Sequence, residues 1–465
     1  MTGVQTCALP IFDFFGGEEG TPTAAERVAP WLLSHRDQLQ ESIRRLVDGT
    51  GLTAADWAWE GWAEHLMALL ADVQRDYRDE AAVYRELMDE AYAAKKGSKG
   101  DYFGRVLKTL ERRNLLGFLA NRNLIPKYGF PVDTVEMRIP GGVAGATQLD
   151  LARDLSQAIF EYAPGARVVA GGKIWKSAGI ARQRERENPP VYYRVCKKCD
   201  SYEESAVEDH GPCKTCGEPP SGVPHKYIEP RFGFLASSET ERTGDAAPRA
   251  SWRGQTRIAK DGTVAEADTI PTPHGDIAFE VMERASMVRI NAGSTDRGFK
   301  VCNFCGFSVA GYEEWPSSHN DPLKSRYCNG SSSTFSLAHK YETDVLRVSF
   351  PQAWSGGDPQ STAQSVLYAV LQAAASVLQI AATNIDGAVS SYHTAAPTID
   401  IVDTVPGGAG YARIIAQALP AVLRGALQLA LECECGPETS CYMCLRSFTN
   451  QRVHDLLARG AAAEF

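Results

Sequence analysis

The pattern of hydrophobic and polar positions separates a helical first part of the chain from a mixed later part. Apolar residues recur at three- and four-residue spacing over residues 24–33, 35–46 and 57–77, which is typical of amphipathic helices. A further helix is expected over residues 103–119, after a stretch at 94–100 whose Lys, Ser and Gly content is typical of a linker. The first part is therefore predicted to be largely α-helical.

Short runs of β-branched and aromatic residues appear from residue 134 onward. Strands are predicted at residues 134–139, 167–169 and 191–195, and a helix at 151–162. From residue 344 strands and helices alternate, which is typical of a parallel or mixed sheet. The elements expected there are a strand at 345–350, a helix at 361–382, a strand at 399–402 and a helix at 411–431.

The longest apolar run, around residues 366–382, is too polar for a membrane span, because Gln372, Ser376 and Gln379 interrupt it. We expect a buried helix there and no membrane partner. Residues 1–12 lack the basic start of a secretory signal and are predicted to be a non-native leader. These observations predict a cytoplasmic protein.

The charge is acidic overall but unevenly distributed. The formal net charge is -9, yet residues 95–127 and 167–198 each hold nine Lys/Arg against two Asp/Glu. Two such blocks could bind nucleic-acid phosphate, or they could be ordinary solvated surfaces. The candidate contacts are Arg112, Arg113, Lys127, Arg182, Arg184 and Arg186, and nearby Tyr102, Phe103, Tyr128 and Trp175 could stack on bases or pack in the core.

Twelve cysteines without an export signal favour metal binding over disulfides. Cys196-x2-Cys199 and Cys213-x2-Cys216 are two hooks with the spacing of a four-thiolate zinc ribbon. Near the C-terminus, four more cysteines lie within twelve residues and are predicted to form a closed structural zinc site. They are Cys433, Cys435, Cys441 and Cys444.

A middle cluster has only three cysteines, so its fourth ligand must be another residue type. Cys302-x2-Cys305 forms a hook, and Cys328 is the remaining thiol. His319 lies between them and is the expected fourth ligand, with His339 as the alternative. Together the clusters predict about three Zn²⁺ ions per chain.

The residues from Asp403 to Tyr411, with the sequence Asp-Thr-Val-Pro-Gly-Gly-Ala-Gly-Tyr, connect an expected strand to an expected helix. A tight structural turn is favoured over a phosphate-binding loop, because the Lys and Ser/Thr of a P-loop are missing. The sequence contains no P-loop motif, no nucleophile elbow and no His-Glu-x2-His. We therefore assign no catalytic residues and expect the chain alone not to hydrolyse ATP.

The predicted fold class is mixed α/β or α+β and multidomain, with a helical N-terminal part, zinc-ribbon insertions and a C-terminal α/β unit that carries the four-cysteine cluster. The expected division is as follows: 1–12 leader, 13–93 acidic helical segment, 94–190 basic α/β segment, 191–340 zinc-ribbon region with two zinc sites, and 341–465 C-terminal zinc-binding domain.

Several stretches together resemble a known family. They are Leu119 with residues 124–131, 151–154 with 161–165, 291–293 with 298–306, Thr343-Asp344, the turn from Asp403 to Tyr411, and the four final cysteines. This set resembles the MrfA-type zinc-binding region of large DEAD/DEAH-box helicases and is similar to DrmB of the DISARM antiphage system. The resemblance implies that the final cysteines bind zinc and that the motor lobes lie elsewhere.

We therefore expect a non-motor zinc-binding part or partner of an ATP-dependent DNA helicase, which contacts DNA, braces the motor lobes, or does both, in DNA repair or antiviral defence. DNA and a helicase motor, in cis or as a separate subunit, are the expected partners. One alternative is a metal-dependent nuclease or hydrolase that uses Asp400 and Asp403. Another is a protein–protein scaffold that does not contact nucleic acid.

Overall fold

The computed structural model is a mixed α/β structure, as the sequence predicts, and it forms two compact units. Unit 1 comprises Met1–Val132 with Gln183–Glu187, and unit 2 comprises Asp133–Arg182 with Asn188–Phe465. The five-segment division stays a prediction. The structure describes residues 9–16, 21–48, 58–122, 124–125, 133–140, 149, 151–183, 185–199, 201–208, 211–220, 225–242, 254–324, 326–354, 358–391, 397–405, 407–447 and 449–465.

Unit 1 is helical. Its helices are α1 (Ile11–Phe15), α2 (Ala24–Ser34), α3 (Arg36–Val47), α4 (Trp59–Ala93), α5 (Gly97–Glu111) and α6 (Leu115–Asn121). α5 begins inside the expected linker, and the helix expected over 103–119 is interrupted after Glu111. The Asn114 side chain accepts a hydrogen bond from the Gly117 amide and thereby caps a separate α6.

A capping box fixes the start of α2. The Thr23 hydroxyl accepts from the Glu26 amide, and the Glu26 carboxylate accepts from the Thr23 amide. Gln74 of α4 donates to both side chains, so the cap also holds α2 against α4.

Residues 9–15 pack against the rest of unit 1 and contribute two side chains to its core. The Ile11 amide donates to the Arg113 carbonyl, and the Leu115 amide donates to the Leu9 carbonyl. Ile11 and Phe15 are fully buried. The leader expected at 1–12 stays a prediction, and residues 1–8 lie outside the described part of the chain.

Unit 2 is built on two large sheets and one hairpin. A five-stranded sheet has the order β2 (Ala152–Asp154), β1 (Thr134–Arg138), β8 (Phe234–Arg242), β4 (Lys173–Ile180) and β3 (Arg167–Ala170). α7 (Leu155–Glu161) packs on it through a core that includes Trp175 and Tyr162. The segment expected to be one helix over 151–162 is thus a short strand followed by α7, which Asp154 caps by accepting from the Ser156 amide.

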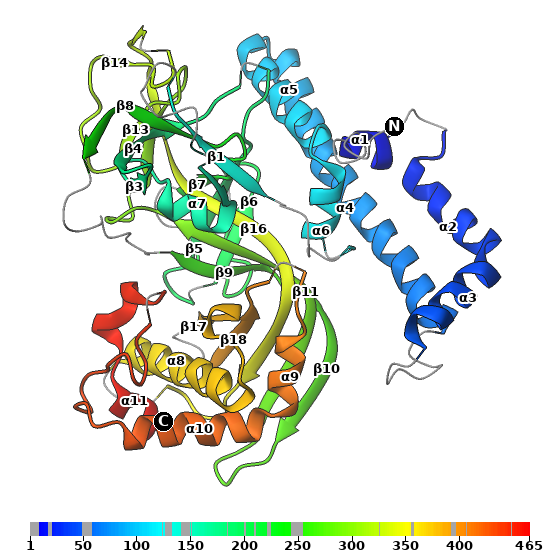
Figure 1. Cartoon of the computed structure of the whole chain (residues 1–465), viewed down its shortest axis with the longest axis vertical. Helices are drawn as coiled ribbons and strands as arrows, with labels where there is room; N and C mark the ends of the chain where they lie inside the picture. The colour runs from blue at the N-terminus through cyan, green and yellow to red at the C-terminus, as the bar shows by residue number, and fades with distance from the viewer. Residues whose placement is uncertain are drawn as a thin grey trace. The chain divides into compact units, whose positions relative to one another are not determined.

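The larger sheet has β11 (Ile277–Asn291) and β16 (Ser332–Ser349) as its long antiparallel centre, curving side by side in Figure 1. Its other strands are β5 (Pro190–Val195), β6 (Tyr202–Ser205), β7 (His225–Ile228), β9 (Gln255–Lys260), β10 (Thr263–Ile270), β12 (Phe299–Cys302), β13 (Ser308–Ala310), β17 (Ile385–Ser391) and β18 (Thr398–Asp403). β14 (His319–Asn320) and β15 (Tyr327–Cys328) form the separate hairpin.

Helices cover the end of this sheet that is formed by β17, β18 and the C-terminal half of β16. α8 (Pro359–Leu378), α9 (Tyr411–Gln417) and α10 (Leu419–Glu432) share one core with these strands, and two short helices, η4 (Gln451–Leu456) and α11 (Arg459–Glu464), follow. The helix expected over 411–431 bends by 83° between α9 and α10. Pro420, in the first turn of α10, explains the break, since proline is tolerated only at a helix start.

By length and composition alone, α8 could cross a membrane, and so could α9 and α10 taken as one bent segment. In the structure α8 already has protein partners. Ala363, Leu367 and Val370 are buried in the core that α8 shares with the sheet.

Candidate metal centres

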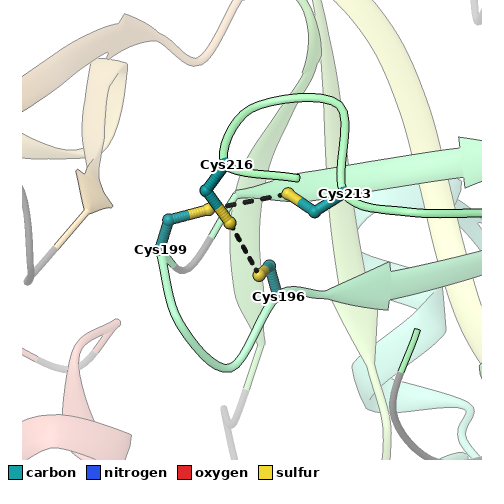
Figure 2. A group of neighbouring side chains, drawn as sticks. All are labelled: Cys196, Cys199, Cys213 and Cys216. Carbon is teal, nitrogen blue, oxygen red and sulfur yellow. Dashed lines mark hydrogen bonds between the residues drawn. The ribbon is translucent and has the colours of Figure 1, made fainter. Parts of the chain in front are cut away.

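The first cysteine cluster lies at the end of the β5–β6 hairpin. Cys196 directly follows β5, and its amide donates to the Ser201 carbonyl, which closes the first hook. In the second hook the Gly217 amide donates to the Cys213 carbonyl, and Gly217 has φ of 72°, a value that glycine adopts readily. Figure 2 shows the four thiols pointing toward one another.

The sulfur–sulfur distances fit one central zinc ion. Four sulfurs at about 2.3 Å from a tetrahedral zinc would lie about 3.8 Å apart. Cys196 and Cys216 Sγ are 3.6 Å apart, and Cys199 and Cys213 Sγ are 3.7 Å apart. A disulfide would need about 2.05 Å, and the eleven cysteines in the described part of the chain are all free thiols.

The middle cluster combines β12 with the β14–β15 hairpin. Cys302 ends β12, Cys305 follows in the same hook, and His319 lies opposite Cys328 in the hairpin. The Cys302 and Cys328 Sγ atoms are 3.8 Å apart, and one ligand atom from each of the four residues lies within 4.8 Å of the others. The structure therefore brings together the three cysteines and the expected histidine.

His319 has the environment of a neutral ligand. It is buried and stacks on Phe307, with ring centroids 4.6 Å apart. Neither ring nitrogen has a hydrogen-bond partner in the described protein, and burial lowers the His319 pKa, which favours the uncharged ring that binds metal. The alternative ligand, His339, is elsewhere: its Nε2 lies 3.3 Å from an Asp133 carboxylate oxygen, and its ring stacks on Tyr341.

The C-terminal cluster follows α10 directly. Its four thiols lie 3.6–3.8 Å apart along four edges, between Cys433 and Cys435, Cys433 and Cys441, Cys435 and Cys444, and Cys441 and Cys444. Cys444 is almost fully buried in the core that contains α8 and α10.

Arg459 of α11 ties this cluster to the end of the chain. Its guanidinium donates to the Cys435 carbonyl at 2.6 Å and to the Ala430 carbonyl at 2.9 Å. Four closed thiolates leave no position open for water, so the donor set suits a structural ion.

The turn that follows β18 is closed by its own aspartate. The buried Asp403 carboxylate accepts from the amides of Val405, Ala409 and Tyr411. Because these amides face Asp403, they do not face an outside anion, which supports a structural turn. Gly408 has φ of 73°, and a Cβ there would lie 2.4 Å from an Asp344 carboxylate oxygen.

Asp400 and Asp403 do not converge on one metal. Asp400 is fully buried and accepts from Arg347 at 2.8 Å, whereas Asp403 holds the turn. Among the described residues, the groups whose ligand atoms converge are the three cysteine-rich clusters. The geometry therefore gives both carboxylates structural roles and does not support the nuclease alternative.

Five of the six candidate DNA-contacting residues belong to unit 1, and the structure describes three of these, Arg112, Arg113 and Arg186. Burial lowers the pKa of Arg186, and the positive charges of Arg112 and Arg113 lower it further. Arg113 also lies 3.5 Å from Glu80. Arg182 belongs to unit 2, where its Cγ lies beside Gly306 of the middle cluster. Lys127 and Arg184 lie outside the described residues.

Sequence reasoning missed the exposed aromatic residues of the cysteine hooks. Phe304 lies between Cys302 and Cys305, and Tyr442 lies between Cys441 and Cys444. Both side chains are exposed, whereas Trp175, a candidate base-stacking residue, is completely buried. Their position in the sequence could have indicated this exposure, because the cysteines on either side of them turn inward to the shared site.

Comparison with known proteins gives a family match in the C-terminal part of the chain and a relative that covers almost all of it. Residues 366–445 match the family described as the MrfA Zn-binding domain, and this range contains all four cysteines of the C-terminal cluster. Over 518 aligned positions the chain is 25% identical to Druantia protein DruE of Escherichia coli (strain UMEA 4076-1), covering 97% of this chain and 27% of that protein. The chain thus spans about a quarter of the length of this relative.

Solved structures of one helicase show a weaker likeness. The DUF1998 helicase MrfA bound to DNA has a TM-score of 0.31 at 12% identity, over 68% of this chain and 31% of that one. A second structure of MrfA gives 0.31 at 8% identity, over 69% and 34%. These scores are too low to define a common fold. The family match is confined to residues 366–445: the α8–α10 region with its four-cysteine cluster is similar to the MrfA Zn-binding domain.

Proposed function

We propose that this chain is the non-motor, zinc-binding part of an ATP-dependent DNA helicase, or a separate subunit that partners one. The observation that carries the proposal is the match of residues 366–445 to the MrfA Zn-binding domain, together with four thiols at tetrahedral spacing in that range. The motor lobes would lie in the remainder of a longer protein or in another subunit.

The three clusters would each hold one structural Zn²⁺ ion. Eleven cysteines and His319 supply twelve ligands in three groups of four, and the spacing in each group suits a tetrahedral ion. In each cluster the residues from separate hooks or strands would be joined by the metal. The ions would therefore stabilise the folded arrangement of these segments.

DNA contact would use the positive charge of unit 1. Arg112 and Arg113 lie close enough to Arg186 for their positive charges to lower its pKa in addition to burial, and Arg112 is exposed. Crowding of like charges is relieved when a phosphate binds, so this group suits a nucleic-acid backbone.

The biological setting would be DNA repair or antiphage defence in the cytoplasm. The similarity to a Druantia protein supports the second more directly than the first. A DrmB-like role in a DISARM system would use the same zinc-binding region.

Fluorescence anisotropy with labelled single-stranded, duplex and overhang DNA tests the proposal. The wild-type chain should bind with affinity that falls steeply as salt rises, because phosphate contacts release counterions. Arg112→Glu should weaken binding several-fold. Arg45→Glu is the matched control, because Arg45 is an exposed arginine of α3 paired only with Glu41, which keeps Arg44 as a partner.

The binding data distinguish a DNA-binding protein from a protein–protein scaffold. Binding that Arg112→Glu weakens and Arg45→Glu leaves unchanged supports DNA contact through unit 1. No binding of any DNA by wild-type protein, even at low salt, would replace this part of the proposal with the scaffold reading.

A further inference from the structure

The most exposed aromatic side chains of the described chain belong to the cysteine clusters. Phe304 is 77% exposed, Tyr327 is 73% exposed and Tyr442 is 63% exposed. Each lies directly beside a proposed zinc ligand.

Two of these rings are held by the middle cluster. The Phe304 amide donates to Cys302 Sγ, and its ring lies against Gly330, where an added Cβ would be 2.7 Å from Phe304 Cδ2. Gly330 in turn donates its amide to Cys328 Sγ. Tyr327 precedes Cys328 and pairs with Asn320 in the β14–β15 hairpin. The backbone that carries both rings is therefore anchored to ligands of one metal centre.

Positive charge lies beside these rings. Lys324 and Arg326 are exposed in the segment that leads to Tyr327, and in the described part of the chain neither has an ion pair within 4 Å. The neighbouring Asp321 carboxylate instead accepts from the amides of Leu323 and Lys324. Exposed rings flanked by uncompensated cations are the combination with which proteins bind unpaired bases and their phosphates.

The C-terminal cluster differs in this respect. Tyr442 packs edge-to-face on His454, with ring centroids 5.6 Å apart, and its neighbour Met443 is 83% exposed. The two residues between Cys441 and Cys444 are therefore apolar and carry no cation. Such a surface is better suited to binding a protein than a nucleic acid. The middle cluster is therefore the stronger candidate.

We propose that Phe304, Tyr327, Lys324 and Arg326 form a binding site for single-stranded nucleic acid. An unpaired base would stack on an aromatic ring, and the two cations would contact the adjacent phosphates. The site lies in unit 2 and is distinct in residues from the arginine group of unit 1. The inference rests on the DNA contact of the proposed function and assigns single strands as the ligand of this surface.

Anisotropy with a labelled oligothymidylate and a blunt duplex of the same length tests the site. Phe304→Ala and Tyr327→Ala should each weaken single-strand binding about 5-fold or more, because stacking on an aromatic ring contributes at least that factor per base. Duplex binding should change little, since paired bases are not free to stack. Phe304→Tyr keeps a ring and should restore single-strand affinity.

A double variant, Lys324→Gln with Arg326→Gln, tests the phosphate contacts. Loss of two contacts to a single strand should reduce the slope of log affinity against log salt by about 1.4. Trp31→Ala is the matched control, because Trp31 is a 53% exposed aromatic residue of α2 in unit 1. Zinc content, measured alongside, should stay at the wild-type value in every variant.

The results distinguish this inference from the proposed function. Wild-type protein that binds single strands, with Phe304→Ala and Tyr327→Ala unchanged, would overturn the stacking site and leave the proposed function standing. Equal loss on single strands and duplex would also overturn it, because a site that reads unpaired bases cannot respond to both alike. No binding of any DNA by wild-type protein would sink both.

Discussion

Replacing one thiol of the C-terminal cluster tests whether its metal supports the surrounding core. In Cys441→Ser, the hydroxyl is a poor zinc ligand, so three thiolates remain where the cluster now brings together four. We expect zinc content to fall from about three ions to about two. Metal binding in such sites is coupled to folding, so the loss should also destabilise unit 2.

The packing around the cluster sets the size of the effect. Leu445 directly follows the last cysteine and is fully buried, and the side chain of Leu457 is almost fully buried. Exposing two leucine side chains costs about 3–6 kcal/mol. At about 1.5 °C per kcal/mol for a unit as large as unit 2, the melting temperature should fall by roughly 4–9 °C.

The assay pairs zinc analysis by mass spectrometry with thermal unfolding followed by circular dichroism. Tyr442→Ala is the matched control, because Tyr442 is the exposed neighbour of Cys441 in the same hook and offers no thiol. It should keep full zinc content and the wild-type melting curve. If Cys441→Ser behaves like this control, the cluster is not a structural zinc site.

Three further predictions follow from individual side chains. In elemental analysis, His319→Ala should lose one zinc ion, whereas His319→Cys and His339→Ala should keep the full zinc content. Loss of zinc in His339→Ala but not in His319→Ala would make His339 the fourth ligand instead. Gly408→Ala should destabilise the protein by about 1–3 kcal/mol in denaturant unfolding, because Gly408 has positive φ and an added Cβ would clash with the Asp344 carboxylate. Gly436→Ala is the control and should be nearly neutral, because its Cβ would meet only a side-chain methyl at 3.6 Å. Equal destabilisation by the two variants would refute the clash. Burial raises the pKa of Asp344 to about 6, so ionisation of this carboxyl lowers the stability of the folded state as pH rises above the pKa of the unfolded chain. Asp344→Asn should therefore raise the melting temperature at pH 8, and this gain should vanish below pH 4. A gain that does not depend on pH would contradict this prediction.

The arrangement of elements was partly predictable. The periodicity that indicated helices at 24–33 and 35–46 corresponds to α2 and α3. α2 buries Ala25 and Leu32, whereas α3 has the same periodicity without a fully buried residue. The single helix expected over 411–431 was wrong, since Pro420 begins a new helix rather than continuing the old one. The apolar pattern runs through both helices, so periodicity alone could not reveal the bend.

The cysteine groupings were determined by the sequence itself. Thiols separated by two residues, in hooks such as Cys196-x2-Cys199, cannot move far apart, so short-range geometry already limits them to one metal. The same holds for the four C-terminal cysteines, which lie within twelve residues. The mixed α/β class was also determined in this way and is confirmed, because local periodicity differs between helices and strands.

Only the tertiary structure decided the contacts between residues far apart in the chain. Strand register places His339 in β16 opposite Arg289 and next to Asp133, and leaves His319 beside the middle thiols. Packing buries Trp175 and exposes Phe304, although both are large aromatic residues. Register and burial depend on which distant segments meet, and no local pattern contains that information.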